Sequence, residues 1–479
     1  MKILFISAEV YPFAKVGGLA DVVGSLPKEL EKMGHDVRVV MPAYGLIERG
    51  YADRTLNIQP MPINLSVQLE GQWIESGIFT GTLPDSDIPV YFVANQMLLG
   101  REQVYGYDDD VYRFAFFSKA ALQFMVETLA WQPDVLHAHD WHTAPAVTWL
   151  ATAGQSDSRY REIKSLFTIH NLAHHGRAHW HIFDYLQLHS HSLAEESYDE
   201  VNFMARGIYH AAKINTVSPT YAAEIMTQSG GTGLDGLLRY RSPDVSGILN
   251  GLDTVVWNPA KDKNLEARYS AGKLHPRKKN KAKLQEQLGL EQNPDVPMLA
   301  MISRLDYQKG LDLMGEVIYR LLEGECGPVQ IVILGSGNPD YEEMFRQFAQ
   351  SYPSKMAAIL AYSPALAPLI YAGSDIFLMP SLFEPCGLGQ LISMRYGSVP
   401  IVRATGGLAD TVADGETGFV FDNYSTNSFW HAVQRATYVY NTNQKEWKNI
   451  QKNGMKQDFS WGSSAAEYEA LYKKMVGAS

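Results

Sequence analysis

Two cations follow one predicted strand closely. Arg304 and Lys309 lie in SRLDYQKGLDL, after the apolar run PMLAMI and before a helical pattern. Cations this close together could neutralise a diphosphate whose charge grows as a sugar–phosphate bond breaks, and a metal ion would then be dispensable. The same residues also fit a structural role, in which Lys309 caps or solvates a helix and Arg304 pairs with Asp306.

A glycine-containing loop follows the first predicted strand, KILFISA. In AKVGGLAD, Gly17 and Gly18 permit φ > 0 and close approach to the backbone, and the helix start near Leu19 favours an anion. Lys15 adds a positive charge beside them. An ordinary strand-to-helix turn has the same pattern. Neither GxGxxG nor GxxxxGK[ST] occurs in this loop, so neither a dinucleotide cofactor nor a P-loop NTPase is indicated.

A single carboxylate stands in the loop LFEPCGLGQL. Glu384 lies between the predicted strand DIFLMPS and a helix that starts near Gly387. There it could accept hydrogen bonds from sugar hydroxyls, while the helix N-terminus faces a phosphate. A glutamate in a first helical turn is also simply a favourable partner of the helix dipole.

Histidines gather in HAHDWH and IHNLAHHGRAHWH. His137 and His139 would share one strand face, a spacing that superficially resembles a metal site. No matching cysteine or carboxylate cluster accompanies them, so we expect no metal. A hexose pocket would use imidazoles and Asp140 equally well. An exposed loop or short helix is expected for His174, His175, His179 and His181.

Alternating strands and helices must position these residues. The chain opens with a strand, an amphipathic helix and a second strand, DVRVVMP, which is a βαβ pattern. Gly34 has the place of a helix C′ glycine, and Pro27 should end or kink the helix before it. Parallel strands with loops at their C-terminal ends are predicted at DVLHAHD (134–140), KSLFTIHN (164–171) and KINTVSP (213–219).

The strand pattern restarts at about Val245, with SGILNGLD. GGLAD occurs at 17–21 and again at 406–410, each time after a strand and at the start of a helix. This repetition predicts an α/β protein of two Rossmann-like, doubly wound domains, whose glycine turns face one deep interdomain cleft. The predicted bounds are 1–244 for the N-terminal domain, 245–455 for the C-terminal domain, and 456–479 for a helix that crosses back to the N-terminal domain. The polar stretch 258–296, with its short basic run, is expected to be a solvated helix with loops, and an acceptor-binding patch is the alternative.

Composition limits the classes of protein. A chain of 479 residues is long enough for two domains, and its net charge of -11 argues against non-specific nucleic-acid binding. Only Cys326 and Cys386 are cysteines, so we expect free thiols. No run approaches the roughly 20 apolar residues of a membrane span, and no signal-peptide pattern opens the sequence. We therefore expect a cytoplasmic protein with no membrane partner.

The motifs together resemble those of one family. Eight segments occur in the order seen in bacterial glycogen synthases and plant starch synthases: KVGGLADVVGSLP, HAHDWHT, FTIHNLAHHG, NTVSPTYAAEI, GILNGLD, SRLDYQKGLDL, PSLFEPCGLGQL and TGGLADTV. The resemblance covers nearly the whole chain. It implies the GT-B architecture and a retaining transferase that moves glucose from ADP-glucose to the non-reducing end of an α-1,4-glucan, either glycogen or a maltooligosaccharide. It implies neither cofactor nor metal, and leaves the formation of a homo-oligomer open.

The resemblance also implies roles for residues. His170 would contact the transferred glucose, Arg304 and Lys309 would neutralise the diphosphate, and Glu384 would accept from sugar hydroxyls. Tyr362 would stack on the base. The other residues implied to bind substrate are Lys15, Gly17, Gly18, Asp21, Asp140, Asn171, Asn250, Cys386, Gly387, Leu388, Gly389, Thr405, Gly406 and Gly407.

Two positions depart from the related patterns. Position 389 is Gly where many relatives have Thr, which leaves only a backbone amide for phosphate, and position 392 is Ile where many other GT-B enzymes have a carboxylate. With no carboxylate nucleophile evident, we favour front-side attack through an oxocarbenium-like state. The alternatives are another GT-B transferase such as a sucrose or trehalose-phosphate synthase, a catalytically silent glucan-binding protein, and a metal-dependent hydrolase. The residues alone do not choose between ADP-glucose and UDP-glucose.

Overall fold

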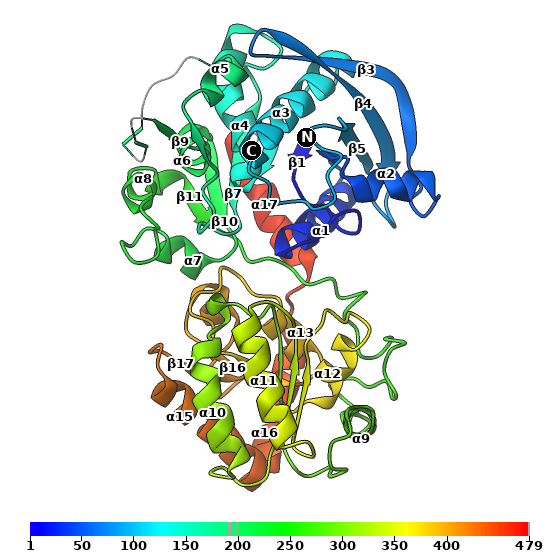
Figure 1. Ribbon diagram of the computed structural model, residues 1–479, viewed down its shortest axis with the longest axis vertical. Helices are drawn as coiled ribbons and strands as arrows, with labels where there is room; N and C mark the ends of the chain where they lie inside the picture. The colour runs from blue at the N-terminus through cyan, green and yellow to red at the C-terminus, as the bar shows by residue number, and fades with distance from the viewer. Residues whose placement is uncertain (189–192, 195, 198, 478–479) are drawn as a thin grey trace. The chain divides into compact units, whose positions relative to one another are not determined.

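The chain folds into two α/β units. The computed structural model describes residues 1–188, 193–194, 196–197 and 199–477. One unit comprises Met1–Gly251 with Trp461–Ser479, and the other comprises Leu252–Ser460. Each unit has its own sheet and its own covering helices, as Figure 1 shows. The prediction of two α/β domains is confirmed.

The N-terminal unit is built on one mixed sheet with the strand order β11-β10-β7-β6-β1-β2-β5-β4-β3. Its strands are β1 (Lys2–Ile6), β2 (Asp36–Pro42), β3 (Gln59–Leu69), β4 (Gln72–Thr82), β5 (Pro89–Ala94), β6 (Val135–His139), β7 (Lys164–Ile169), β10 (Lys213–Thr216) and β11 (Val245–Gly247), and a separate pair is formed by β8 (Arg177–His179) and β9 (Glu200–Asn202). The helices are α1 (Gly18–Lys32), α2 (Gly45–Ala52), α3 (Asp110–Gln123), α4 (Asp140–Ala151), α5 (Ile182–Leu186), α6 (Phe203–His210), α7 (Pro219–Glu224), α8 (Asp235–Tyr240) and α17 (Trp461–Val476).

The predicted parallel strands of this unit are confirmed. β1 pairs in parallel with β2 and β6, and β7 pairs in parallel with β6 and β10. Gly34 follows the last turn of α1 with φ +88°, as a C′ glycine does. The helix does not end at Pro27, since α1 runs through this residue, and the alternative of a kink there stays a prediction. The antiparallel strands β3 and β4 extend the sheet beyond the predicted pattern.

The C-terminal unit has a fully parallel sheet with the strand order β14-β13-β12-β15-β16-β17. Its strands are β12 (Met298–Ile302), β13 (Gln330–Leu334), β14 (Met356–Ile359), β15 (Ile376–Met379), β16 (Val399–Arg403) and β17 (Phe419–Phe421). Its helices are α9 (Arg277–Leu288), α10 (Leu311–Leu322), α11 (Pro339–Ser351), α12 (Ala367–Gly373), α13 (Gly389–Arg395), α14 (Gly406–Thr411), α15 (Thr426–Thr442) and α16 (Gln444–Lys456). Alternating strand residues bury two apolar clusters, because parallel sheets are covered on both faces.

The bounds of the units differ from the predicted 244/245 and 455/456. β11 pairs in parallel with β10, so the segment after Val245 completes the first sheet instead of starting the second. At the other end, α16 runs to Lys456 and α17 begins only at Trp461. α17 belongs to the N-terminal unit, where it packs against α1.

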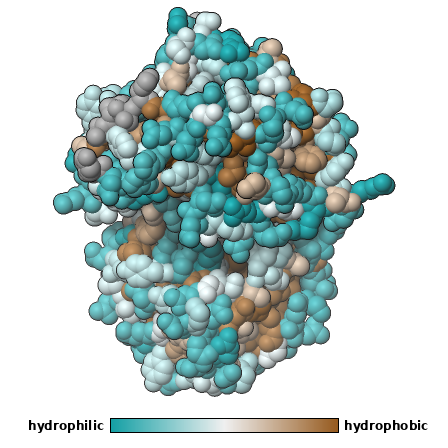
Figure 2. Space-filling model, turned by 45° about the horizontal axis from the view of Figure 1, so that its top comes forward, coloured by the Kyte–Doolittle hydropathy of each residue, from teal (hydrophilic) through white to brown (hydrophobic). Residues whose placement is uncertain are grey.

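The molecular face in Figure 2 is mainly hydrophilic, with apolar residues in separate patches. Among the described residues, no helix combines the length and apolar character that crossing a membrane requires.

Candidate active site

The predicted residues of the N-terminal unit lie at one edge of its sheet. The glycine loop follows β1, Asp140 follows β6, and His170 follows β7. Asn250 comes shortly after β11. Because these strands are parallel neighbours, their C-terminal ends share one edge, where ligands of open α/β sheets bind.

The glycine loop carries a paired lysine. Lys15 Nζ lies 2.7 and 2.8 Å from the two carboxylate oxygens of Asp21. A Cβ added to Gly17 or Gly18 would meet no atom within 4 Å, so the backbone there is open to close approach. The expectation of φ > 0 is wrong, since Gly17 has φ -136° and Gly18 is not in the left-handed region either.

A carboxylate that the sequence interpretation missed organises this loop. Glu9 is buried, and its Oε2 accepts hydrogen bonds from the backbone N–H groups of Val16 and Gly17 at 2.5 and 2.8 Å. Tyr105 donates its hydroxyl to Oε1 at 2.7 Å. The Gly17 amide is therefore already used, and an anion would have to be held by Lys15 and by amides further into α1. The sequence signal for this role was the glutamate of ISAE, Glu9, which stands directly after the first predicted strand.

Asp140 joins two neighbouring loops. It has φ +55°, and its Oδ1 accepts backbone N–H groups from His170 at 2.7 Å and Asn171 at 3.4 Å. Burial raises the pKa of Asp140 to about 7, and the two backbone donors oppose that rise. A left-handed aspartate at the end of a buried strand is a backbone outlier of the kind found at functional sites.

We expect kcat/KM to rise with pH through about 7, because only ionised Asp140 is a pure hydrogen-bond acceptor. Since folding raises this pKa, the free energy of unfolding should fall as pH rises from about 4 to 7. Asp140→Asn should lower activity, and it should remove both the rise of kcat/KM and the fall of the free energy of unfolding with pH. pH profiles of rate and of urea unfolding measure them, and an unchanged ascending limb in the variant would exclude this assignment.

His170 is buried and held by a second imidazole. Its Nε2 lies 3.0 Å from Nδ1 of His139, and the His139 ring lies against His137 with centroids 4.1 Å apart. Burial lowers the pKa of His170 to about 3, so the ring is neutral at pH 7. A neutral imidazole can donate one hydrogen bond and accept another, which suits a sugar hydroxyl.

The shared strand face of His137 and His139 is confirmed, and its chemistry is hydrogen bonding. The Thr168 hydroxyl donates to Asn215 Oδ1. His137 Nε2 lies 2.6 Å from the same hydroxyl oxygen and must therefore donate its N–H to it. His137 Nδ1 then accepts from Tyr472 of α17 at 2.7 Å. Among the described residues, no group of three histidine, cysteine or acidic side chains is placed to hold a metal ion.

Tyr472→Phe is expected to lower the free energy of unfolding by about 1–3 kcal/mol, because it leaves His137 Nδ1 buried without its donor. Urea unfolding measures the change. Tyr438→Phe, on the exposed surface of α15, is the matched control and should stay within about 0.5 kcal/mol of wild type. A Tyr472→Phe protein as stable as this control would contradict the network.

Two asparagines complete this edge. Asn171 uses Oδ1 to accept the Ala173 backbone N–H at 3.0 Å, which shapes the turn after His170. Asn250 is buried, and its Oδ1 has no hydrogen-bond partner among the described residues. An orphaned buried acceptor is uncommon and suits a ligand donor.

Of the predicted histidines after Asn171, His174 is exposed, whereas His175 is half-buried and its ring bonds to Thr232 and Asn202. His179 and His181 are exposed, and His179 belongs to the short pair of β8 and β9. Of the segment 172–191, residues 189–191 fall outside the described residues.

In the C-terminal unit, Lys309 and Glu384 form a largely buried ion pair. Lys309 Nζ lies 2.8 Å from Glu384 Oε2, and their side chains are 16% and 8% exposed. Ser381 donates to the same oxygen at 3.0 Å. Gly310, with φ +71°, lets the chain pass Pro380, whose carbonyl oxygen a Cβ would approach to 2.0 Å. Residues that follow β12 and β15 are thereby brought together.

Arg304 lies on the segment after β12 that also carries Lys309. Its side chain is 65% exposed, and it lies 3.3 Å from Asp306. The structural alternative for Arg304 is thus present, as a loose surface pair that is worth little stability. Tyr362, after β14, is 82% exposed, and its stacking on a base stays a prediction.

The glycines after β15 and β16 serve packing. A Cβ at Gly406 would lie 2.0 Å from the carbonyl oxygen of Glu384, and a Cβ at Gly407 would lie 2.2 Å from the carbonyl oxygen of Cys386. Gly387 has φ +78°, and a Cβ at Gly389 would contact Phe377 and Met379. Cys386 and Thr405 are buried in the same loops, and Leu388 precedes the first residue of α13. These residues hold Glu384 in place, and their contact with substrate stays a prediction.

Comparison with known proteins fits these observations. Residues 2–240 match the starch synthase catalytic domain and residues 281–457 match glycosyl transferases group 1. The chain is 43% identical to glycogen synthases of Moorella thermoacetica and Thermotoga maritima, each over 99% of this chain and at least 97% of the relative. It resembles the catalytic domain of starch synthase IV from Arabidopsis thaliana, solved with ADP and acarbose, with TM-score 0.89 and 36% identity over 99% of both chains. Sucrose-phosphate synthase of Thermosynechococcus elongatus, at 17% identity and TM-score 0.61 over the full length of both chains, shares the fold.

The two α/β units and these matches define a glycosyltransferase of the GT-B class. Within that class, the chain belongs to the glycogen and starch synthase family.

Proposed function

We propose that this chain transfers glucose, with retention, from ADP-glucose to the non-reducing end of an α-1,4-glucan, so that glycogen grows and ADP is released. The observation that carries the proposal is the identity of 43% with glycogen synthases over 99% of the chain. The similar starch synthase structure contains ADP, which favours an adenine nucleotide as the donor's leaving group.

The C-terminal unit would bind the nucleotide end of the donor. Arg304 and Lys309 would stabilise the charge that develops on the diphosphate, and Tyr362 would stack on the base. Glu384 neutralises Lys309 in part and fixes the position of its ammonium group. The Glu384 carboxylate would also accept hydrogen bonds from hydroxyl groups of the glucose.

The N-terminal unit would bind the glucose and the acceptor. His170, neutral because it is buried, would hydrogen-bond the glucose, with Asp140 and Asn250 as further polar partners. The acceptor O4 attacks C1 from the side of the leaving group, the bond from C1 to the phosphate oxygen breaks, and the hydroxyl proton passes to that oxygen. This front-side course retains the anomeric configuration without a carboxylate nucleophile.

The reaction would need neither a metal nor a cofactor, since the two cations take the place of a metal ion at the diphosphate. We further propose a cytoplasmic enzyme, where Cys326 and Cys386, neither of which forms a disulfide, would stay reduced.

Incorporation of labelled glucose into glycogen tests the proposal. ADP-glucose and UDP-glucose are supplied separately, each with and without EDTA. We expect strong incorporation from ADP-glucose, little from UDP-glucose, and no effect of EDTA. Transfer from UDP-glucose alone would overturn the assignment of ADP-glucose as the donor. Loss of activity with EDTA would overturn the proposal that the reaction needs no metal. A folded protein that binds glycogen without transfer from either donor would instead be a glucan-binding protein.

A further inference from the structure

A basic pocket lies at the opposite edge of the C-terminal sheet from the residues above. It has a volume of ≈ 320 Å³, within the range of small-molecule sites. Its lining includes Asp375, which directly precedes β15, whereas Glu384 comes after that strand. Helices α9 and α16 supply most of the remaining wall. The pocket is therefore separate from the nucleotide site at the other end of the same strands.

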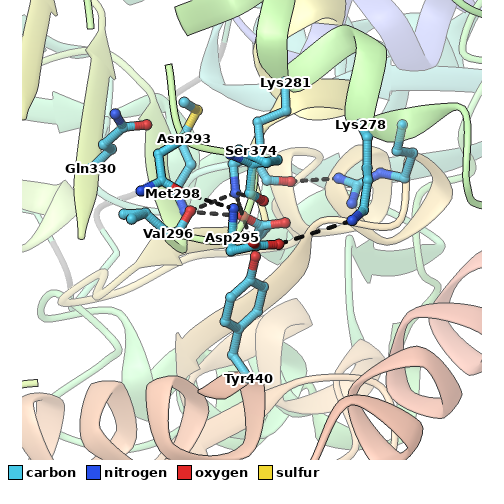
Figure 3. A network of polar contacts seen from close by, with 12 residues as sticks. Lys278, Lys281, Asn293, Asp295, Val296, Met298, Gln330, Ser374 and Tyr440 are labelled. Carbon is cyan, nitrogen blue, oxygen red and sulfur yellow. Dashed lines mark hydrogen bonds and ion pairs between the residues drawn. The ribbon is translucent and has the colours of Figure 1, made fainter. Parts of the chain in front are cut away.

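The rear of the pocket is an ordinary structural network. Lys281 lies 2.8 Å from Asp375 Oδ2 and donates to the backbone carbonyls of Pro294 and Val296. Figure 3 shows this amine beside Val296, and Tyr440 below it. The buried lysine and the aspartate neutralise each other, so neither is available for a charged ligand.

The front of the pocket carries positive charge without matching carboxylates. Lys448 and Lys452, four residues apart on α16, form no ion pair among the described residues. Lys278 has only Asp295, 4.0 Å away, as Figure 3 also shows. Arg277 donates to the backbone carbonyls of Tyr371, Ser374 and Tyr396 and also contacts Tyr269, but no carboxylate pairs with it among the described residues. Four cations thus converge in a protein of net charge -11.

The first turn of helix α9 also has an excess of positive over negative charge. The helix begins with Arg277, Lys278 and Lys279, and its first turn contains no acidic residue. Cations at a helix N-terminus oppose the helix dipole and one another. The first amides already bond to Leu274, His275 and Pro276, so side chains and not free N–H groups would hold a ligand.

A second signal comes from an unused donor. Trp447 lines the pocket and is buried, and its indole N–H has no hydrogen-bond partner among the described residues. A buried donor without an acceptor is uncommon in folded proteins. An anion in the pocket would offer acceptor oxygens and would relieve the repulsion between the cations.

We propose that this pocket binds a small phosphate compound, with the phosphate held by Lys278, Lys448 and Lys452 and by the guanidinium of Arg277, which also lines the pocket. Lysine ammonium groups and an arginine fork match the charge and geometry of a phosphate dianion. Inorganic phosphate and a phosphate monoester share this chemistry. Tyr440 and Leu274 give the organic part of a monoester an apolar wall. The inference is independent of the donor and acceptor proposed above.

Binding is measured by calorimetry on the full chain, with saturating ADP to occupy the nucleotide site and sodium chloride to match ionic strength. The probes are inorganic phosphate, a hexose monophosphate and citrate. The test variant is Lys448→Gln/Lys452→Gln. The control is Lys445→Gln/Lys456→Gln, which removes the same charge from α16 at exposed positions outside the pocket.

We expect saturable binding of a phosphate probe, at least tenfold weaker in the test variant and within twofold of wild type in the control. Tighter binding of the hexose monophosphate than of inorganic phosphate would identify a monoester as the ligand, and the reverse order would identify free phosphate. No saturable phosphate binding, equal weakening in both variants, or a preference for citrate would overturn the proposal. Melting curves of both variants verify that they fold.

Discussion

Replacing Arg304 with alanine is expected to lower kcat for glucosyl transfer about 10²–10³-fold, the usual cost of removing one preorganised donor to developing charge. The free energy of unfolding should change by less than about 0.5 kcal/mol, because this side chain is largely exposed and pairs only loosely with Asp306. Initial rates with ADP-glucose and glycogen, together with urea unfolding, measure the two quantities.

Arg346→Ala is the matched control for this prediction. Arg346 is also a surface arginine of the C-terminal unit with one acidic neighbour, and it lies on α11 away from the loop after β12. It should leave both the rate and the stability unchanged. A near-normal kcat in Arg304→Ala would remove this residue from the mechanism.

Lys309→Met should reduce activity and stability together. It leaves the Glu384 carboxylate buried without its cation, and breaking a buried pair in this way costs about 3–5 kcal/mol. kcat should also fall about 10²–10³-fold, because the second cation at the diphosphate is lost. Urea unfolding and initial rates are again the measurements.

The double variant Lys309→Met/Glu384→Gln separates the two effects. It removes both charges and keeps the hydrogen-bonding shape at position 384, so much of the stability should return while kcat stays low. Recovery of kcat in parallel with stability would show that Lys309 acts only through folding.

The sequence predicts the strands well where one short apolar run ends in a polar loop. DVLHAHD and KSLFTIHN identify β6 and β7, and the parallel pairing follows from the alternation with helices. β3 and β4 were missed because their antiparallel pairing interrupts that alternation. The short β11 was assigned to the wrong domain, since three residues carry no signal for the sheet that they join.

The site could be predicted as a set of residues but not as a set of contacts. Lys309 and Glu384 are 75 positions apart, and only the neighbouring strands β12 and β15 bring them together. Glu9 occupies the Gly17 amide, a competition that no local motif shows. Similarly, the close approach of Gly406 and Gly407 to the backbone of Glu384 and Cys386 is a packing requirement that the motif did not show.

The most direct test of the proposed activity is mass analysis of products from ADP-glucose and a single maltooligosaccharide, with ADP release measured in parallel. We predict a ladder of products, each one hexose longer than the last, that an α-1,4-specific hydrolase degrades, with one ADP released for each hexose added. ADP release with free glucose and no elongated oligosaccharide would contradict the account, because the enzyme would then be a hydrolase.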